Sequence, residues 1–280
     1  MPNVRAILVS GASSGIGEAT VLAAARRGML VYAGVRNAAD AQRIAALHEN
    51  IRAVNLDVTD AGSIDAAIGA IRAGGTALAG LVNNAGIALG GPIESLPLDA
   101  LREQFEVNCF GAIALTQAAL PLLHQQPSRI VFVGSIAGRI AVPYVAAYSA
   151  SKFALRAFAD ALRIELKPSA IDVCLIEPGS VATPIWSKGR AMRDTMLARL
   201  PATAPAYYRE AVESVARGTE AEERDGLAPA VVADAIVHAL TARKPKAHRV
   251  IGTPARLGAL VALLPPPLHD RFLRASMRLP

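Results

Sequence analysis

Short apolar segments recur along the chain, and each is followed by a longer alanine-rich segment in which apolar residues return every three or four positions. Short runs rich in β-branched residues are typical of buried strands, whereas the longer spacing is typical of helices. Near-continuous apolar strands predict a parallel sheet covered by helices on both faces. We place the strands at Val4–Ser10, Leu30–Arg36, Ile51–Leu56, Leu81–Asn84, Arg129–Gly134, Ile171–Glu177 and His248–Gly252. The pattern therefore predicts an α/β fold with a Rossmann-like, doubly wound parallel sheet in a three-layer sandwich.

This alternation continues through the chain without an internal repeat or a linker, so we predict one domain over residues 1–280. Residues 183–227 interrupt it with prolines and mixed charge, and we interpret this stretch as a substrate lid. Residues 253–280 form a C-terminal tail in which apolar stretches alternate with Arg271, Arg274 and Arg278. We expect the tail to pack on its own protein, with a dimer contact or a membrane surface as alternatives.

The composition narrows the classes of protein. Apolar residues make up 52% and charged residues 19% of the chain, which favours a folded globular protein over a disordered one. The net charge is +6, but the basic residues are scattered, so we expect no nucleic-acid partner. We expect no signal peptide, transmembrane segment or metal site, and a cytoplasmic location. The two cysteines, Cys109 and Cys174, are then expected to remain reduced.

A glycine-rich turn follows the first predicted strand and opens a helix that we expect to start at about Glu18. Glycines there let the backbone turn tightly and approach a pyrophosphate, whose charge is stabilised by the free N–H groups of the helix end. The glycines of this turn are spaced G-x-x-x-G-x-G, and an ordinary glycine-rich turn is the alternative. The cofactor-binding residues predicted here are Gly11, Ser13, Ser14, Gly15, Ile16 and Gly17.

The end of the second strand indicates which nicotinamide cofactor binds. An acidic residue there would bind the ribose 2′-hydroxyl of NAD, but Val35 occupies that position and Arg36 follows. A guanidinium can clamp a 2′-phosphate through two parallel hydrogen bonds. The sequence therefore favours NADP(H), with NAD(H) as the alternative if Arg36 is only a solvated loop residue.

Two further strand ends carry candidate cofactor residues. Asp57, followed by Val58, is within reach of an adenine amino group in such a fold, although it could instead cap the helix that starts after Asp60. Asn84, Ala85 and Gly86 end the fourth strand, where small residues allow close cofactor approach and an amide can tie neighbouring loops together. A plain Asn/Gly turn is the alternative there.

The candidate catalytic residues lie in the second half of the chain. Tyr148 and Lys152 are four residues apart in a helical segment, so both side chains share one face. An ammonium beside a phenol favours the phenolate, which would make Tyr148 a general acid or base. Ser135 ends the fifth strand and can donate a hydrogen bond to a reacting oxygen, unless it only caps the next turn. Asn108 lies inside a long helix, and its amide could hold a water that returns protons to Lys152 if it points inward.

Taken together, these motifs resemble the short-chain dehydrogenase/reductase family over nearly the whole chain, in order and approximate spacing. The resemblance implies that Ser135 orients a carbonyl, Tyr148 protonates it, and Lys152 binds the nicotinamide ribose. It also implies that Asn108 completes a proton relay. Further cofactor-binding residues implied by the resemblance, flanking the nicotinamide, are Pro178, Gly179, Val181 and Thr183. Within the family, the sequence is most similar to the steroid and retinol dehydrogenase branch, and a homodimer or homotetramer is expected.

Apolar residues near the crevice indicate a hydrophobic ketone or alcohol as substrate. The predicted substrate contacts, besides Ser135 and Tyr148, are Val142, Pro143, Tyr144, Ile185 and Trp186. One alternative is a 3-oxoacyl-carrier-protein reductase, which would share every catalytic residue. A dinucleotide-binding regulator without catalysis is another, although a regulator needs no proton donor. A nucleic-acid binder is the third.

Overall fold

The computed structural model describes residues 5–185, 194, 197–198, 200, 203–277 and 279. It contains a seven-stranded, all-parallel sheet with the order β3-β2-β1-β4-β5-β6-β7. The strands are β1 (Ala6–Val9), β2 (Leu30–Val35), β3 (Ile51–Asn55), β4 (Leu78–Asn83), β5 (Ser128–Val133), β6 (Ile171–Pro178) and β7 (His248–Ile251). The predicted fold class is confirmed, and the strand order reverses between β1 and β4, which is where such sheets bind ligands.

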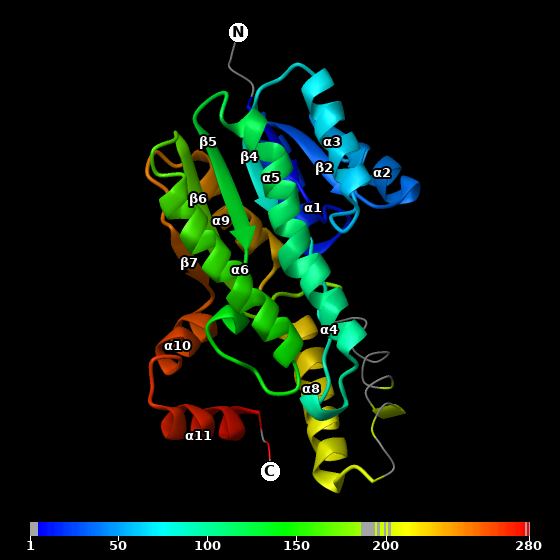
Figure 1. Cartoon of the computed structure of the whole chain (residues 1–280), viewed down its shortest axis with the longest axis vertical. Helices are drawn as coiled ribbons and strands as arrows, with labels where there is room; N and C mark the ends of the chain where they lie inside the picture. Colours follow the sequence, from blue (N-terminus) through cyan, green and yellow to red (C-terminus); the bar gives the residue numbers. More distant parts are fainter. Residues whose placement is uncertain are drawn as a thin grey trace.

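Helices cover both faces of this sheet, as the apolar strands require (Figure 1). The side chains of Ile7 and Val9 pack toward the layer of α1 and α9, whereas those of Ala6 and Leu8 pack toward the layer of α3, α5 and α6. The helices of these layers are α1 (Gly15–Ala25), α3 (Ala61–Ala73), α5 (Gly111–Leu123), α6 (Ala146–Glu165) and α9 (Pro229–Thr241). A shorter helix, α2 (Ala38–Ala45), packs against β2 and β3 at the sheet edge.

The remaining described helices extend beyond the carboxyl ends of the strands (Figure 1). They are η1 (Ile93–Ser95), α4 (Leu98–Phe105), the π-helical turn η2 (Glu106–Phe110), η3 (Ile136–Gly138), α8 (Ala206–Asp225), α10 (Thr253–Val261) and α11 (Pro266–Ser276). The tail is thus two helices, anchored by the buried side chains of Ala255, Val261 and Leu273. Part of the predicted irregular stretch is also helical: α8 buries Ala211 and Val212, while Arg209, Glu210 and Arg217 carry charge on its exposed side.

Two predicted boundaries differ from the structure by three residues. Strand β4 starts at Leu78 rather than Leu81, because Gly80 belongs to the strand and makes room for helix α9: a Cβ on Gly80 would lie 2.8 Å from Leu240 Cδ2. Helix α1 starts at Gly15 rather than Glu18, since the Glu18 N–H already donates to the Ser14 carbonyl at 3.2 Å. Glycine residues obscured both boundaries, because they are poor helix and strand formers in isolation.

The continuous helical segment Leu98–Leu123 is long and apolar enough to cross a membrane by length and composition, and it is the one such candidate among the described residues. Half of its most apolar window is buried inside the structure. Leu115, Ala119 and Leu123 pack into the core beside the sheet. Core helices of globular proteins show the same combination of length, hydropathy and burial.

Candidate active site

A cavity of about 1010 Å³ follows the carboxyl ends of the strands. The predicted residues that line it are Gly11, Ser13, Ser14, Gly15, Ile16, Arg36, Asp57, Val58, Asn84, Ala85, Gly86, Ser135, Val142, Tyr148, Lys152, Pro178, Gly179, Val181, Thr183 and Ile185. Gly17, Asn108, Pro143 and Tyr144 are not part of the lining. Trp186 lies outside the described residues. Most of the residues proposed from sequence therefore share one cavity.

The glycine-rich turn after β1 is shaped by close backbone contacts. Gly11 and Gly15 have φ angles of +62° and +56°, a region that L-residues with side chains rarely adopt. A Cβ on Gly11 would lie 2.7 Å from Ala85 Cα, and a Cβ on Gly17 would lie 2.2 Å from the Gly11 carbonyl oxygen. Gly17 therefore acts beneath the turn rather than in the cavity wall. The backbone is left accessible at the positive end of α1, where a pyrophosphate can bind.

Asn84 joins this turn to the loop that follows β4. Its Nδ2 donates to the carbonyl oxygens of Ser10 and Gly11, each at 3.0 Å. The Ser10 hydroxyl oxygen accepts from the N–H groups of Asn84 and Ala85 at 3.0 and 3.1 Å. The amide thus ties two neighbouring loops together, as the sequence suggested, and fixes the floor of the cavity at the point where the strand order reverses.

The adenosine end of the cavity carries Arg36 and Asp57. Arg36 is exposed and lines the cavity, and its charge contributes to lowering the pKa of Asp57. The main cause of the lowered Asp57 pKa is the hydrogen bonding of Oδ1 to the N–H and hydroxyl of Thr59, at 2.9 and 2.7 Å. Asp57 does not cap the next helix. Asp60 does so, by accepting from the N–H groups at the start of α3.

Sequence reasoning missed a second arginine beside the glycine-rich turn. Arg43, on α2, contacts the Ser13 carbonyl oxygen and pairs with Glu18 at 3.0 Å. Its Nη2 also lies 3.4 Å from Asp40, and the hydrogen bond to Glu18 is the main cause that raises the pKa of the guanidinium. An arginine on an exposed helix face looks like ordinary surface charge in a sequence, so only the contact across the turn identifies it.

Ser135 begins the short helix η3 at the end of β5. Its Oγ accepts from the Ala137 N–H at 3.1 Å, so the capping alternative is correct as far as it goes. That bond uses an oxygen lone pair and fixes the oxygen at the cavity wall, while hydrogen donation toward a ligand stays compatible with it. Gly138 lets η3 approach α6 closely, because a Cβ there would lie 2.9 Å from the Lys152 carbonyl oxygen.

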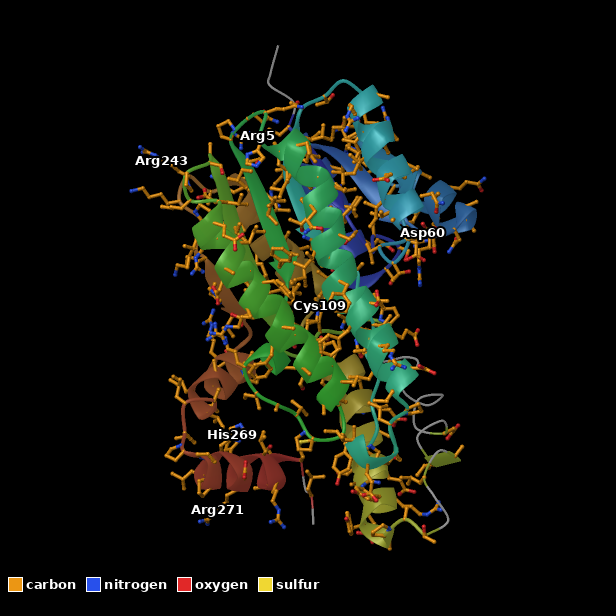
Figure 2. The ribbon with its side chains drawn as sticks, viewed as in Figure 1. Arg5, Asp60, Cys109, Arg243, His269 and Arg271 are labelled. Carbon is orange, nitrogen blue, oxygen red and sulfur yellow. The ribbon has the colours of Figure 1, made fainter. Side chains whose placement is uncertain are left out.

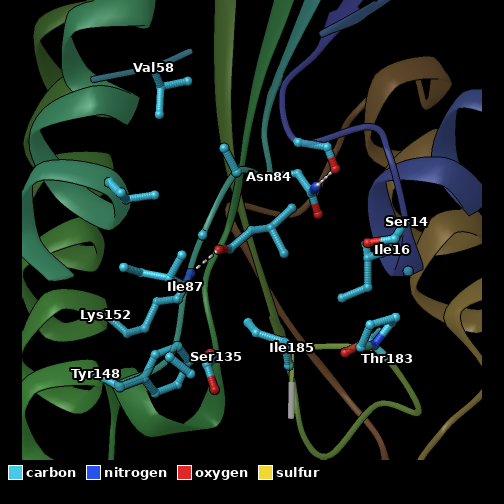
Figure 3. Close-up of a pocket in the computed structure, with 18 of the residues that line it drawn as sticks. Ser14, Ile16, Val58, Asn84, Ile87, Ser135, Tyr148, Lys152, Thr183 and Ile185 are labelled. Atoms are coloured by element: carbon cyan, nitrogen blue, oxygen red, sulfur yellow. Dashed lines mark hydrogen bonds between the residues drawn. The ribbon is translucent and has the colours of Figure 1, made fainter. Parts of the chain in front are cut away.

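Tyr148 and Lys152 share one face of α6, next to Ser135 (Figure 3). Lys152 Nζ donates to the Val133 carbonyl oxygen at 2.9 Å and lies 5.7 Å from the centre of the Tyr148 ring. Burial lowers the pKa of Lys152 to about 8, with a smaller opposing contribution from Cys109. Cys109 lies near the centre of the molecule, where α5 and α6 come together (Figure 2). A positive charge is therefore held beside a phenol that faces the cavity.

Asn108 points inward from the π-helical turn η2 and is buried. Its Nδ2 donates to the Ile87 carbonyl oxygen at 2.9 Å and to Ser151 Oγ at 3.1 Å, and its Oδ1 accepts from the Ile87 N–H at 2.8 Å. These bonds show that the amide holds the loop after β4, and the second lone pair of Oδ1 stays compatible with the relay water that the sequence suggested. The backbone of this loop is too distant in sequence for a motif to reveal the contact.

Gln104, one turn before Asn108, holds the same loop and was not singled out from the sequence. Its Nε2 donates to the Ile87 carbonyl oxygen and its Oε1 accepts from the Leu89 N–H, both at 2.7 Å. The side chain is fully buried. The spacing of four between Gln104 and Asn108 was the one signal in the sequence that both face the same way. Polar residues at this spacing are, however, also typical of the solvent-exposed face of an amphipathic helix.

The substrate end of the cavity is apolar. Val142, Ile185 and Val215 pack around Ala88 and Tyr148, and Val215 comes from α8, a segment that the sequence did not resolve into a helix. Tyr148 faces the space that Ile185 borders (Figure 3). An apolar wall beside Ser135 and Tyr148 suits a hydrophobic group attached to a carbonyl.

Tyr144, predicted as a substrate contact, lies at the rim of this region instead. Its φ of +63° is the one positive value for a non-glycine residue in the described chain. The left-handed backbone directs its carbonyl oxygen to accept from the Gly91 N–H at 2.7 Å, and its ring meets the Tyr208 ring edge-on at 6.4 Å. Tyr144 therefore joins two loops to α8 rather than lining the cavity.

The turn after β6 completes the nicotinamide end. The Gly179 N–H donates to the Ile251 carbonyl oxygen at 3.0 Å, which fixes the turn to β7. Val181 pairs with Leu227, and Thr183 reaches the glycine-rich turn, since a Cβ on Gly15 would lie 3.0 Å from its Cγ2. The glycine turn, the helix end, the buried lysine and this turn together fit a nicotinamide dinucleotide laid along the strand ends.

Comparisons with known proteins agree with this geometry. Residues 5–194 match the family model described as short chain dehydrogenase. The chain is 34% identical to the NADPH-dependent 3-dehydrocapnine reductase of Ornithobacterium rhinotracheale over 98% of both chains. It is 42% identical to the 3-amino-tetrahydro-pyrrolizinone reductase of Xenorhabdus hominickii, over 66% of this chain and 64% of that reductase, which is less than two thirds of its length.

A solved structure is similar over nearly the whole chain. It is a short-chain dehydrogenase from Streptomyces avermitilis, with a TM-score of 0.78 at 28% identity, covering 99% of this chain and 96% of that one. The named relatives are bacterial reductases, so they support the family without singling out its steroid and retinol dehydrogenase branch. The chain belongs to the short-chain dehydrogenase/reductase family and is an oxidoreductase that acts on CH–OH and C=O groups with NAD(P)H.

Proposed function

We propose that the protein transfers a hydride between NADP(H) and a hydrophobic ketone or secondary alcohol of the steroid, retinoid or fatty type. The observation that carries this proposal is the placement of Ser135 and Tyr148 at an apolar wall of the cavity, with the buried Lys152 ammonium 5.7 Å from the tyrosine ring. That combination suits a neutral carbonyl better than a charged group.

The residues divide the reaction between them. The bound cofactor supplies the hydride that reaches the carbonyl carbon during reduction. Ser135 Oγ, fixed by the Ala137 N–H, donates a hydrogen bond to the carbonyl oxygen. Tyr148 gives its phenolic proton to the same oxygen, which yields the alcohol, and the Lys152 ammonium stabilises the phenolate left behind. Alcohol oxidation uses the same groups in reverse.

Arg36 supports a preference for the phosphorylated cofactor. It borders the adenosine end of the cavity, where no carboxylate takes the place of Val35. Arg43 also contacts the Ser13 carbonyl oxygen near this end, but its charge is balanced by Glu18 and Asp40, so Arg36 carries the preference. The relative named as an NADPH-dependent reductase agrees with this preference.

Assembly is a further part of the proposal. The exposed rings of Phe110 and Phe153 lie at the start of α5 and on α6, the long helices that carry the Asn108 and Tyr148 segments. Exposed aromatic side chains on paired helices suit contact with a second copy. We propose a homodimer or homotetramer built on these helices, to be tested by light scattering.

The test follows the absorbance of NADPH, and separately NADH, with a panel of hydrophobic ketones, aldehydes and 3-oxoacyl thioesters. We expect turnover of the ketones with a lower KM for NADPH. Selective turnover of acyl-carrier thioesters would favour the 3-oxoacyl reductase instead, and cofactor binding without turnover would favour a regulator.

The cofactor preference has its own variant. We expect Arg36→Ala to raise the KM for NADPH about tenfold or more while leaving that for NADH nearly unchanged, because a charge-assisted phosphate contact is lost. Arg52→Ala is the matched control, since Arg52 is exposed on β3 and bonds the Glu49 carbonyl oxygen. Equal losses for both cofactors in Arg36→Ala would contradict the proposed phosphate contact.

A further inference from the structure

A cluster of four charged or ionisable side chains lies outside the cavity lining and has no part in the proposed proton transfer. Arg139 forms a bidentate ion pair with Glu177: Nε donates to Oε1 at 2.8 Å and Nη2 donates to Oε2 at 2.6 Å. His248 stands between two carboxylates, with Nδ1 3.3 Å from Glu177 Oε2 and Nε2 2.6 Å from Asp160 Oδ1. The cluster therefore links η3, β6, β7 and α6.

The charges in this cluster are matched. Glu177 is 1% exposed, and although burial alone would raise its pKa, hydrogen bonds from His248 and Arg139 outweigh burial and lower it. The hydrogen bond to Glu177 is also the largest cause that raises the pKa of His248, and Asp160 adds to it. An imidazolium can donate to both carboxylates at once, whereas a neutral ring can donate to only one.

Other charges surround the same histidine. On α6, Arg163 and Arg156 face Asp160 at 2.5 and 3.9 Å. Arg139 Nη2 lies 3.3 Å from His248 Nδ1. These cations limit how far the two carboxylates can favour the charged histidine, although Asp160 makes the shortest contact with its ring, at 2.6 Å.

Three of the four members of the cluster, Arg139, Glu177 and Asp160, are attached to a catalytic or cofactor-binding segment. Arg139 directly follows η3, four residues after Ser135. Glu177 directly precedes Pro178 and Gly179 in the turn that borders the nicotinamide end. The third attachment, Asp160, lies on the same helix as Tyr148 and Lys152. A shift in the ion pair would therefore move the carbonyl-binding hydroxyl relative to the nicotinamide-binding turn.

We infer that the Arg139–Glu177 pair, linked through His248 to Asp160, is a positioning cluster that sets the distance between the substrate carbonyl held by Ser135 and the nicotinamide held by the Pro178–Gly179 turn. This inference rests on the proposed function, since it assigns the cluster a role in hydride transfer. None of the four residues touches the reacting atoms, so they act through the segments that they hold.

An ion pair is suited to this task because of its geometry. A buried pair gains little net stability once the desolvation of both charges is counted. The planar guanidinium and carboxylate nevertheless fix one another in distance and orientation through two parallel bonds. Hydride transfer is sensitive to such alignment, and a misplacement of about 1 Å can cost about 100-fold in rate.

The chain offers a matched control at the other end of the same two strands. Arg129 and Asp172 are register partners on β5 and β6, and Arg129 Nη1 lies 2.9 Å from Asp172 Oδ2. Arg129, like Arg139, is largely buried, with a side chain 17% exposed against 21% for Arg139. This second pair joins the strands at their amino ends, away from the cavity.

The experiment compares Arg139→Lys with Arg129→Lys in the full chain. Lysine keeps the positive charge but cannot form the bidentate ion pair. We expect Arg139→Lys to lower kcat about 10- to 100-fold and to increase the deuterium isotope effect on hydride transfer from C4-deuterated NADPH. Arg129→Lys should stay within about twofold of the unmodified protein in both. Equal kcat and isotope effects in the two variants, once corrected for folded protein, would overturn the inference.

A second variant keeps the test decisive if Arg139→Lys does not fold. In the unmodified protein we expect the isotope effect to grow as pH rises through the His248 pKa, because deprotonation breaks one of its two carboxylate contacts. In His248→Gln that pH dependence should disappear. An unchanged pH profile in His248→Gln would exclude the histidine link.

The inference can also be separated from the proposed function. If no carbonyl in the panel is reduced by the unmodified protein, the proposed function fails, and the cluster is then tested by the nicotinamide fluorescence of bound NADPH. We expect Arg139→Lys to change that emission and Arg129→Lys to leave it unchanged. Identical emission in all three proteins would overturn the positioning role by itself.

Discussion

Glycines serve different purposes at the two ends of the strands. We call the side of the sheet where the strands begin its amino edge, and the side where they end its carboxyl edge. At the amino edge, Gly28 and Gly75 have φ angles of +79° and +71°, and no atom lies within 4 Å of where a Cβ would be. At the carboxyl edge, Gly11 has a similar φ of +62°, but a Cβ there would lie 2.7 Å from Ala85 Cα. The amino-edge glycines serve only the turn, whereas Gly11 also brings two loops into contact.

Some of the arginines show the same contrast, although Arg129 at the amino edge is itself paired with Asp172. Arg5 and Arg243 lie at the amino edge with their side chains directed outward (Figure 2), whereas Arg139 at the carboxyl edge is locked on a buried glutamate. The residue types at the two edges are alike, so composition does not distinguish them. Residues near the active site differ in that each fulfils two structural requirements at once, such as a turn conformation and a close contact with another loop.

The largest effect on kcat is expected from removing the hydroxyl of a buried tyrosine, and the same substitution away from the cavity serves as its control. Tyr148→Phe should lower kcat by about 100-fold to 10,000-fold, the usual contribution of a general acid, while NADPH still binds. Tyr32→Phe is the matched control, because Tyr32 is also buried, on β2, with its hydroxyl near Gly74 at the end of α3. Steady-state kinetics and NADPH titration measure both. Near-normal turnover by Tyr148→Phe would refute the proposed proton donor.

A smaller effect is expected from one methyl group added to a helical glycine. Gly17→Ala should weaken NADPH binding about tenfold or more, because the new Cβ would lie 2.2 Å from the Gly11 carbonyl oxygen and displace the turn. Gly69→Ala on α3 meets no atom within 4 Å and should raise the free energy of unfolding by about 0.5–1 kcal/mol. Fluorescence titration measures NADPH affinity, and urea unfolding measures the free energy of unfolding, for both variants. Unchanged NADPH affinity in Gly17→Ala would contradict the proposed role of close glycine contacts at the carboxyl edge.

The smallest effect concerns the charge buried at the carboxyl edge. Burial lowers the pKa of Lys152 to about 8, so its ammonium is present below that pH and is lost above it. We expect kcat/KM for carbonyl reduction to fall about fivefold between pH 8 and pH 9. In Lys152→Arg the residual activity should lack this decline, because a guanidinium stays charged over this range. A decline that persists in Lys152→Arg would assign it to another group.

The lowered pKa of Lys152 also affects the free energy of unfolding, which changes with pH in the opposite direction to the activity. Between pH 8 and the ordinary lysine pKa of about 10.4, the unfolded chain keeps a proton that the folded protein has released. The contribution of Lys152 to the free energy of unfolding therefore rises with pH across that window. Activity and stability thus change in opposite directions for this one group.

The sequence alone predicted what depends on short-range pattern. The strands are apolar runs, so their carboxyl ends could be located to within one residue, and Ser135 and Asn84 lie just after two of these ends. Tyr148 and Lys152 were paired correctly on one helix face because their spacing matches the helical repeat. These predictions need only the neighbours of each residue.

What the sequence did not show depends on contacts between distant segments. Gln104 and Arg43 look like surface residues until their bonds to Leu89 and Ser13 are known. The left-handed backbone of Tyr144, which moves it from the cavity wall to the rim, carries no sequence signal because the residue is not glycine. Such features arise only when the fold brings the segments together.

The π-helical turn Glu106–Phe110 shows how one helical segment serves two surfaces. A regular helix advances about 100° per residue, so the additional residue in this turn rotates everything before it by about that angle relative to everything after it. Gln104 and Asn108 are thereby aimed at the loop after β4, while Leu115 and Ala119 remain in the core. A regular helix through this segment would turn Gln104 away from the loop after β4 by about 100° if the core residues kept their places, so the irregularity is what allows one helix both to fill the core and to hold the active-site loop.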